Sequence, residues 1–378
     1  MKKFKSIYFM IALLFVIAYA LESAWTTKRL TNNTGASRFP DVAASGSDVY
    51  AVWQDDTTGK TCVFFRKSDD NGATWKPARK LTNGSDGWER PAVAVSDTYA
   101  YVVYQEEISG SANNEIYFMK SVDKGETWQA AKRLTNNAGN SESPLIAADG
   151  SSICVAWKDY TPGNWEIYFR RSTDGGATWK TSKRITNNAG DSYPTSIAVD
   201  GQNVFLVWGD DTPGHAEVFF RRSTDGGATW QNAKQLTNSA NPTSGADIAV
   251  DNQNVFLVWS DDNPDYDIYF RRSADGGSSW QAKKKLTSNA GMSGEAEITA
   301  MGSNLYLVWD DDTGMDCTEI FFRQSADGGT TWQAAKRLTY TSGCSWHPIV
   351  AANDARLFVA WDDDTPGNWD IYMKHSPL

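Results

Sequence analysis

The carboxylates and tryptophans that could do chemistry in this chain mostly recur at a fixed spacing. The pattern Ser-x-Asp-x-Gly-x-x-Trp occurs six times. An aspartate in such a turn can accept N–H groups of its own backbone, and the glycine permits a positive φ. We therefore expect these carboxylates to be structural. They are Asp70, Asp123, Asp174, Asp225, Asp275 and Asp327.

Runs of acidic residues form a second recurring feature. Oxygen-rich loops can hold Ca²⁺, and two runs with three carboxylates each are the best candidates. They are Asp310, Asp311, Asp312 and Asp362, Asp363, Asp364. The Thr-Pro-Gly that follows several of these runs instead indicates tight turns, in which Asp accepts local N–H groups. We expect no cofactor, and calcium only as a weaker alternative.

Four of the 17 tryptophans stand outside the recurring pattern, as do several arginines, tyrosines and histidines. Exposed aromatic rings suit stacking on sugar rings or a protein hot spot. The alternative is that each ring merely covers its own hairpin. The candidate ligand-binding residues are Trp88, Arg90, Trp165, Tyr193, His215, Tyr266, Trp346, His347 and Trp369.

The elements that must position these residues follow from an internal repeat. One series of tryptophans recurs at intervals of 50 to 53 residues, from Trp25 to Trp332, and a second apolar-apolar-aromatic-x-acid series also has seven members. In residues 194–238, four short apolar or alternating runs are separated by Asp-Gly-Gln, Asp-Asp-Thr-Pro-Gly and Asp-Gly-Gly turns. Four antiparallel strands per repeat are typical of a propeller blade. We expect the fourth strand of this repeat over 230–237.

The two ends of the chain complete each other. The C-terminus stops after a third strand, whereas Trp25 to Thr31 repeats the end of a blade. We therefore expect residues 25–31 to complete the last blade, which closes the ring and removes two open sheet edges. The predicted fold is an all-β, seven-bladed β-propeller that forms one domain over residues 21–378.

On these six turns the chain resembles the Asp-box, or bacterial neuraminidase repeat, propellers of the sialidase-like superfamily. The resemblance implies that the Asp-box turns lie on one face and functional loops on the other. For a sialidase-type exo-glycosidase it also implies an arginine triad, a Tyr–Glu nucleophile pair and an acid/base Asp. The segment Arg38-Phe39-Pro40 looks like the Arg-Ile-Pro of many sialidases, but it also fits the ordinary repeat.

Catalysis requires paired carboxyls beside a shaped pocket. The predicted loops are short and uniform, and the longest departure is residues 105–115. If the protein is an enzyme, we expect Glu106, Glu107 and Arg90 to be its catalytic residues. We favour non-catalytic recognition of a glycan or a surface partner on the face opposite the Asp boxes. A sialidase-like hydrolase and a purely structural propeller of a cell-surface assembly remain alternatives.

The N-terminus predicts export. A basic start, an apolar run and Ala18-Tyr19-Ala20 are typical of a cleaved signal peptide over residues 1–20. A retained N-terminal anchor is the alternative. Cleavage would remove three lysines and change the formal charge from −10 to −13. Such an acidic chain argues against nucleic acid as a partner. We expect a secreted, cell-surface or periplasmic monomer.

The cysteines fit that compartment. Cys317 and Cys344 are expected in loops of the same face, and an exported chain permits a disulfide between them. Cys62 and Cys154 fall on predicted strands of different repeats, so we expect them to be buried thiols.

Overall fold

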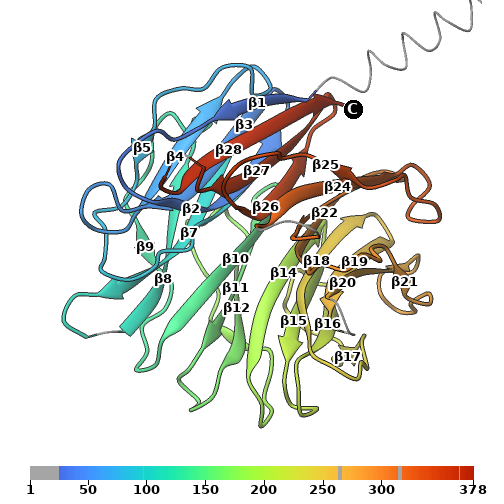
Figure 1. The fold of residues 1–378 in the computed structure, drawn as a ribbon. Coiled ribbons are helices and arrows are strands. Elements are labelled where there is room, and N and C mark those ends of the chain that lie inside the picture. The colour runs from blue at the N-terminus through green and yellow to red at the C-terminus, as the bar shows by residue number, and fades with distance from the viewer. Residues whose placement is uncertain (1–24, 97, 112, 263–265, 314–316, 366) are drawn as a thin grey trace, which may run out of the picture.

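The structure is a computed structural model that describes residues 25–378, except residues 97, 112, 263–265, 314–316 and 366. In that part of the chain the regular elements are strands, arranged in seven four-stranded antiparallel sheets around a central axis (Figure 1). The seven-bladed propeller is thus confirmed. The predicted signal peptide lies outside the described residues. Within them, no helix has the length and apolar character to cross a membrane.

Each blade is built from four consecutive strands, except the last. Blade 1 contains β2 (Ser37–Ser45), β3 (Asp48–Asp55), β4 (Cys62–Ser68) and β5 (Arg79–Lys80). Blade 2 contains β6 (Ala92–Ser96), β7 (Tyr99–Ile108), β8 (Asn113–Ser121) and β9 (Lys132–Arg133). Blade 3 contains β10 (Ser141–Asp149), β11 (Ser152–Asp159), β12 (Glu166–Ser172) and β13 (Lys183–Arg184). Blade 4 contains β14 (Ser192–Asp200), β15 (Asn203–Asp210), β16 (Glu217–Ser223) and β17 (Lys234–Gln235).

The remaining blades continue the same order. Blade 5 contains β18 (Thr243–Asp251), β19 (Asn254–Asp261), β20 (Asp267–Ser273) and β21 (Lys284–Lys285). Blade 6 contains β22 (Ser293–Met301), β23 (Asn304–Asp311), β24 (Glu319–Ser325) and β25 (Lys336–Arg337). Blade 7 contains β26 (Ser345–Ala352), β27 (Arg356–Asp363), β28 (Asp370–Pro377) and β1 (Thr26–Arg29).

The second strand of each blade forms the core because it is apolar on both faces. In β15, Phe205 and Val207 pack toward blade 5, whereas Leu206 and Trp208 pack toward blade 3. Successive side chains of a strand point to opposite faces of the sheet. The continuous apolar run that identified these strands therefore holds both neighbouring blades.

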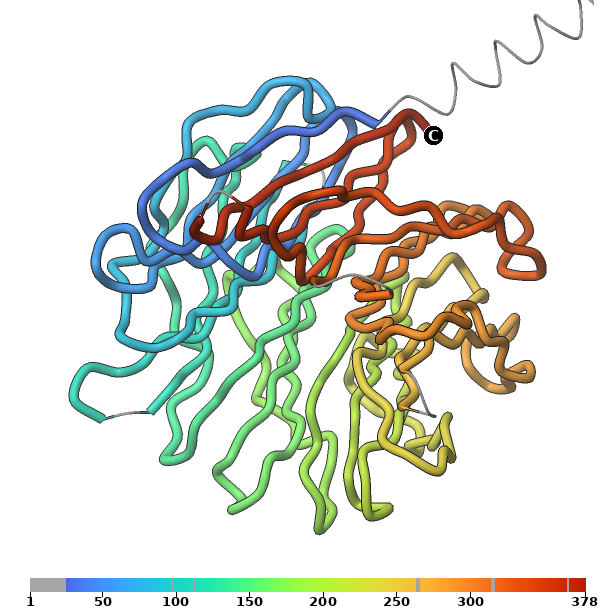
Figure 2. The backbone as a smooth tube through the Cα atoms, in the orientation of Figure 1, coloured from blue at the N-terminus to red at the C-terminus, as the bar shows by residue number. Residues whose placement is uncertain are grey.

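The ring closes through its two chain ends, as predicted. Strand β1 pairs antiparallel with β28, from Thr26 opposite His375 to Arg29 opposite Tyr372. The blue and red segments run side by side in Figure 2. Both edges that an open ring would expose are thereby paired.

The Asp-box turns are held by local hydrogen bonds, as blade 4 shows. The Asp225 carboxylate accepts the Thr229 N–H at 2.7 Å and the Thr229 hydroxyl at 2.6 Å. Hydrogen bonds from Thr229 and Ser223 lower the pKa of Asp225. Gly227 has a φ of 86°, and a Cβ there would lie 2.4 Å from the Phe169 ring of blade 3. The turn thus requires glycine for its positive φ and for close packing against blade 3, the preceding blade.

Two strand boundaries differ from the sequence-based expectation. The fourth strand of blade 4 is limited to Lys234–Gln235 instead of 230–237. The Trp230 ring packs edge-on against Phe169 of blade 3 with centroids 5.1 Å apart, and the chain leaves the sheet register to place it there. Residues 105–115, expected as the longest loop, instead extend the hairpin, because β7 continues to Ile108 and β8 begins at Asn113.

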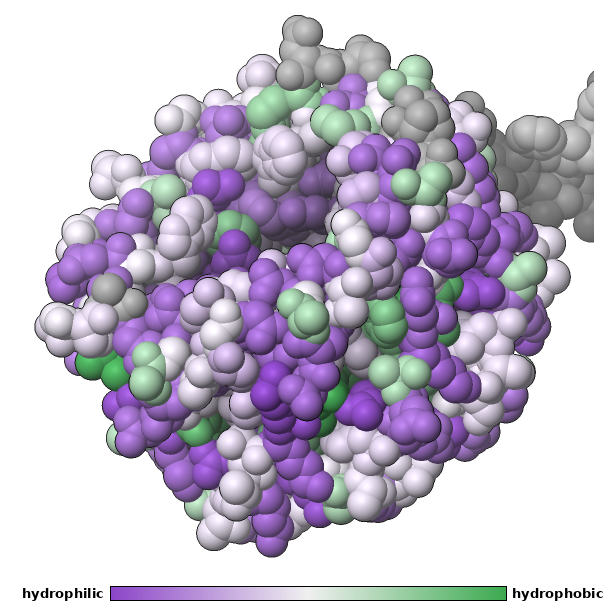
Figure 3. Space-filling view, turned by 90° about the horizontal axis from the view of Figure 1, so that it is seen from below, coloured by the Kyte–Doolittle hydropathy of each residue, from purple (hydrophilic) through white to green (hydrophobic). Residues whose placement is uncertain are grey.

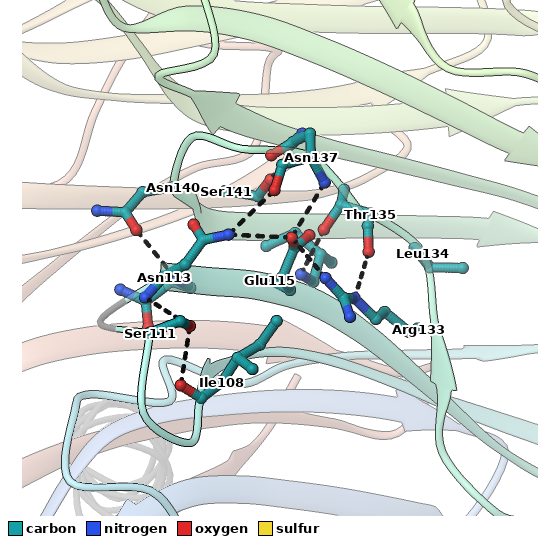
Figure 4. A network of polar contacts seen from close by, with 12 residues as sticks. Ile108, Ser111, Asn113, Glu115, Arg133, Leu134, Thr135, Asn137, Asn140 and Ser141 are labelled. Atoms are coloured by element: carbon teal, nitrogen blue, oxygen red, sulfur yellow. Dashed lines mark hydrogen bonds and ion pairs between the residues drawn. The ribbon is translucent and has the colours of Figure 1, made fainter.

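A polar network fixes the loops that join blades, and Figure 4 shows it for blades 2 and 3. The Glu115 carboxylate lies 2.7 Å from Arg133 Nη2 and accepts the Asn137 N–H at 3.1 Å. The same arrangement joins Glu166 to Arg184 at 2.8 Å in blade 3. The acids that open the third strands are therefore framework residues.

Cys317 and Cys344 form the predicted disulfide, with Cα atoms 5.1 Å apart. It joins the loop after β23 to the segment that leads into blade 7. Cys62 and Cys154 are buried free thiols. The two bonded cysteines are 27 residues apart in the sequence.

We expect loss of this disulfide to lower the free energy of unfolding by about 3 kcal/mol, because the unfolded chain regains loop entropy. The measurement is denaturant unfolding of the wild type and of a Cys317→Ser/Cys344→Ser variant. The wild type in reductant serves as an internal comparison and should match the variant. Equal free energies of unfolding for the oxidised wild type and the variant would show that the disulfide does not stabilise the fold.

Candidate functional site

Seven equivalent residues, one from each blade, surround the mouth of the central channel; we call them the mouth ring. All seven line a cavity of about 540 Å³ between the first strands. Seen from below, the molecule has a mostly hydrophilic surface with a hollow in it (Figure 3). The mouth ring consists of Phe39, Arg90, Ser143, Pro194, Gly245, Glu295 and His347.

The backbone of the mouth ring is strained. Six of its members have positive φ, from 38° at Arg90 to 54° at Gly245, and five of those six are not glycine. A bulge shifts the register of the first strand at this point in most blades, for example between Arg38 and Asp41. Non-glycine residues at positive φ are costly and cluster at functional sites. This position is therefore a candidate for function.

The mouth ring is chemically asymmetric. Blades 6, 7, 1 and 2 contribute Glu295, His347, Phe39 and Arg90, whereas blades 3, 4 and 5 contribute Ser143, Pro194 and Gly245. The charged and aromatic half makes one side of the ring chemically different from the other, which a ring of near-identical repeats would not be. The uniform loop lengths predicted from the sequence had argued against such an asymmetry.

His347 is held by a buried carboxylate. Its Nδ1 lies 2.9 Å from Asp362 Oδ2, and its Nε2 lies 3.8 Å from Glu295 Oε1. Burial lowers the pKa of His347, but the hydrogen bond to Asp362 and the charges of Asp362 and Glu295 outweigh burial, so that pKa is raised. Asp362 also accepts the Phe39 N–H at 3.1 Å. The imidazole is thereby oriented with Nε2 toward Glu295.

A second buried carboxyl lies behind Glu295. Asp310 is 3% exposed, and its Oδ2 has no hydrogen-bond partner among the described residues. Burial and the nearby charge of Glu295 raise the pKa of Asp310. The Glu295 side chain is 48% exposed, and its partial desolvation at the channel mouth raises its pKa against the opposing charge of His347. Two side chains at the mouth can thus carry a proton, and each has a buried acid nearby: Asp310 for Glu295 and Asp362 for His347.

A small pocket beside the mouth ring lies between two tryptophans; we call it the tryptophan pocket. Its volume is about 280 Å³, and Arg38, Gln54, Asp56, Trp88 and Trp369 are among its lining residues. The Arg38 guanidinium carbon lies 4.4 Å from the centroid of Trp369 and 5.8 Å from that of Trp88. Trp88 is 48% exposed. Aromatic faces, a cation and amide and carboxylate oxygens therefore meet in one pocket.

A second aromatic group lies on blades 3 and 4; we call it the blade 3–4 patch. Lys158 Nζ is 4.2 Å from the centroid of Trp165 and 5.6 Å from that of Tyr193. Trp165 also packs against Tyr160, with centroids 5.1 Å apart. Both tyrosines are exposed.

Residues 54–292 match the family described as BNR repeat-like domain. The chain belongs to the BNR repeat-like domain family. No curated protein sequence matches the chain.

Solved structures share the fold of this BNR propeller at low sequence identity. A Hadza microbial sialidase, Hz136, is 16% identical with a TM-score of 0.56, covering 88% of this chain and 74% of that one. A protein of unknown function from Dyadobacter fermentans is 16% identical with a TM-score of 0.57, covering 93% and 99%. A polysaccharide lyase of family PL25, an ulvan lyase bound to -[GlcA(1-4)Rha3S]-, is 12% identical with a TM-score of 0.63, covering 90% and 94%.

The residues predicted from the sequence of this BNR propeller fall into separate groups. Trp88 and Trp369 meet in the tryptophan pocket, Arg90 and His347 belong to the mouth ring, and Trp165 and Tyr193 belong to the blade 3–4 patch. Trp346 is exposed next to His347. His215 instead lies 3.1 Å from the framework acid Glu217. Tyr266 is exposed, and its hydroxyl faces Asp262, which raises its pKa.

The structure divides the three residues expected to act together in an enzyme between two places. Arg90 lies over the Phe39 ring at 4.8 Å. Burial raises the pKa of Glu106, whose charge acts on the buried Glu89. Glu107 lies near Gly87. Arg90 thus belongs to the channel mouth, whereas the two glutamates belong to the interface of blades 1 and 2.

The carboxylates of each acidic run have different partners. Asp311 accepts the Ser293 hydroxyl at 2.7 Å and the Trp309 indole N–H at 3.1 Å. Asp312 accepts the Met292 N–H at 2.6 Å, whereas Asp310 lies beside Gly294. In the second run, Asp362 holds His347 and Asp363 accepts the Trp361 indole N–H. These carboxylates serve the framework and the mouth ring separately, which does not favour calcium binding there.

The residue pattern did not indicate Phe39 and Glu295 as site residues, and it indicated Asp310 only as a metal ligand. The repeat contained a usable indication. The position of the mouth ring holds a different residue type in every blade. A functional site on a repeat protein is expected to appear as such a position, because its side chains must differ between blades while the backbone geometry is the same.

Proposed function

We propose that this protein recognises a glycan outside the cell, without catalysing a reaction, through the face that carries the mouth ring. The tryptophan pocket is the observation that supports this most directly. A volume of about 280 Å³ is close to the lower limit of small-ligand pockets, which suits a single sugar ring.

The residue types of the pocket match what a sugar offers. The apolar face of a sugar ring can stack on Trp88 or Trp369, as aromatic rings provide large, rigid contact area. Arg38 can donate hydrogen bonds and the Asp56 carboxylate can accept them, whereas the Gln54 amide oxygen already accepts the Glu89 and Arg90 N–H groups, which leaves its NH2 group as a donor. The pocket thus combines two aromatic side chains with several polar groups, and precisely placed polar groups give a ligand site its specificity.

Two further observations support the proposal. Fold neighbours include proteins named as a sialidase and as a polysaccharide lyase with a bound saccharide. The Cys317–Cys344 disulfide suits an oxidising compartment outside the cytosol.

The test is a glycan array followed by calorimetry on the glycans that bind. We expect Trp88→Ala and Trp369→Ala each to weaken binding at least about tenfold, which corresponds to about 1.4 kcal/mol. Tyr340→Ala is the matched control, because Tyr340 is 75% exposed but lines a different cleft between blades 6 and 7. Absence of glycan binding by the wild type, or unchanged binding by the double tryptophan variant, would refute the proposal.

A glycoside hydrolase is the second candidate, and the Glu295–His347 pair favours it. General acid–base catalysis needs proton carriers with shifted pKa values beside a ligand pocket. The same bound glycans can be incubated with the protein and analysed for cleavage products. Turnover that disappears in Glu295→Gln, while glycan binding persists, would replace recognition by catalysis as the function.

A further inference from the structure

We propose that the ligand is a linear acidic polysaccharide that lies across several blades, from the tryptophan pocket over Arg90 to the blade 3–4 patch. This inference rests on the proposed glycan recognition and specifies its ligand. It rests on cationic and aromatic side chains that contact one another in two groups. We call these side chains together the stripe: Trp369, Arg38, Phe39 and Arg90 in the first half, and Lys158, Trp165, Tyr160 and Tyr193 in the second.

The first half of the stripe connects blades 7, 1 and 2. The Arg38 guanidinium lies over Trp369 at 4.4 Å and over Phe39 at 5.4 Å. Phe39 in turn lies under Arg90 at 4.8 Å. Each step is within the range of a cation–π contact. The cations are therefore held in place by the rings before any ligand arrives.

The second half repeats this chemistry on blades 3 and 4. Lys158 contacts Trp165 and Tyr193, and Trp165 packs on Tyr160. Glu142 connects the two halves, because it lies 3.2 Å from Lys158 Nζ and its charge also acts on Arg90. The stripe thus has one half on blades 7, 1 and 2 and the other on blades 3 and 4, with the acidic Glu142 between them.

The length of the stripe argues for a chain of sugars. One sugar ring can cover one aromatic platform, but the tryptophan pocket and the blade 3–4 patch lie on different blades. A monosaccharide in the tryptophan pocket would leave the exposed Tyr160 and Tyr193 of the blade 3–4 patch uncovered. A linear chain places successive rings on both platforms, and each additional contact adds affinity without a second association cost.

The charges of the stripe argue for acidic groups on the chain. Arg38 lies 3.8 Å from Asp362, and Lys158 is paired with Glu142. Among the described residues, Arg90 has no carboxylate oxygen within 4.0 Å. Burial lowers its pKa, so the guanidinium is partly desolvated without a close counter-ion. A carboxylate or sulfate of the ligand would supply that partner in bidentate geometry.

The test compares binding of size-graded oligosaccharides to the full chain by calorimetry. The probes are oligogalacturonates, chondroitin sulfate oligosaccharides and neutral cello-oligosaccharides, in sizes from a disaccharide to an octasaccharide. We expect an acidic series to bind at least about tenfold more tightly as the octasaccharide than as the disaccharide, with the neutral series weaker at every length.

Variants separate the two halves of the stripe. Trp165→Ala should weaken binding of the acidic octasaccharide about tenfold and leave binding of the disaccharide unchanged. Arg90→Gln should weaken acidic probes and not neutral ones, and Arg90→Lys should restore part of the loss. Tyr340→Ala is again the control.

Two results would overturn the inference and leave the proposed function intact. One is binding that depends on Trp88 and Trp369 but neither on probe length nor on Trp165. The other is tighter binding of the neutral series than of both acidic series. Failure of every glycan on the array and of every probe would instead reject the proposed function together with this inference.

Discussion

Replacing Asp370 with alanine is expected to lower the free energy of unfolding by about 2–4 kcal/mol and to release strand β1 from the propeller. Asp370 is completely buried. Its Oδ2 lies 2.6 Å from Arg29 Nη2, and its Oδ1 accepts the Thr31 hydroxyl at 2.7 Å. Removal of one partner from a buried, hydrogen-bonded ion pair costs about 3–5 kcal/mol, and the partial exposure of Arg29 reduces this.

Glu166→Ala is the matched control for this prediction. Glu166 occupies the same repeat position in blade 3 and lies 2.8 Å from Arg184 Nη2. Both variants lose an equivalent ion pair, but the partners of Glu166 belong to the same continuous blade. The partners of Asp370 lie 341 and 339 residues away along the chain.

Hydrogen exchange distinguishes the two variants. In Asp370→Ala we expect faster exchange of the β1 and β28 amides and proteolytic cleavage near Arg29, because strand β1 is anchored by this side chain and four residue pairs. In Glu166→Ala the β1–β28 amides should keep wild-type protection. Equal protection of β1 in both variants would show that the ring does not depend on Asp370 for closure.

The arrangement of the blades could be predicted because the repeat fixes it at every level. The Trp series, the Asp-box turns and the incomplete terminal repeat all require four strands per blade and closure between the chain ends. Each of these features depends on residues within one repeat or on its direct neighbour. Such short-range chemistry is visible in a single sequence.

The interface of blades 1 and 2 shows why other features could not be predicted. Cys62 stands where the other third strands begin with an acid, and Glu89 from the next blade takes the place of that acid. The Glu89 carboxylate accepts the Thr82 hydroxyl at 2.8 Å, as Asp267 accepts that of Thr287 at 2.9 Å. Burial raises the pKa of Glu89 to about 8. Glu89 thus replaces the acid that is missing at Cys62, although the two residues occupy different positions of the repeat.

The mouth ring was hidden for a similar reason. Phe39 lies near the start of the chain and Glu295 and His347 lie near its end, yet the bulges bring all three to one opening. Each of the three differs from the residues at the same position in the other blades, so in the sequence each appears as an ordinary deviation from the repeat. Only the geometry of the ring shows that three deviations form one site.

Three carboxyls deeper in the channel provide the second large effect. Asp41 on β2, Asp247 on β18 and Glu297 on β22 line the channel wall. Burial raises the pKa of Asp41 to about 7 and also raises those of Asp247 and Glu297. The charge of Asp247 further raises the pKa values of Asp41 and Glu297. Asp41 accepts the Val93 N–H and Asp247 the Ile298 N–H, each at 2.7 Å. Backbone hydrogen bonds thus hold the Asp41 and Asp247 carboxyl groups in the wall of the channel.

We expect the protein to lose stability as the pH rises from about 4 to 7, and Glu297→Gln to reduce this loss. An unfolded aspartate releases its proton near pH 4, whereas Asp41 in the folded protein keeps its proton until about pH 7. Across this window the folded state binds more protons, so the free energy of unfolding falls with rising pH. Each pKa unit corresponds to about 1.4 kcal/mol, so the change amounts to a few kcal/mol at most.

Thermal unfolding at pH 5 and pH 8 measures this effect. Glutamine keeps the shape of Glu297 but carries no charge, so Glu297→Gln should raise the melting temperature at pH 8 more than at pH 5. Asp86→Asn is the control, because the Asp86 side chain is 80% exposed and lies away from the channel; its pH profile should run parallel to that of the wild type. A parallel profile for Glu297→Gln as well would mean that the channel carboxyls do not hold protons in the folded state. A wild-type profile steeper than that of Glu297→Gln would instead show that the propeller axis tolerates these acids because they stay neutral at mildly acidic pH.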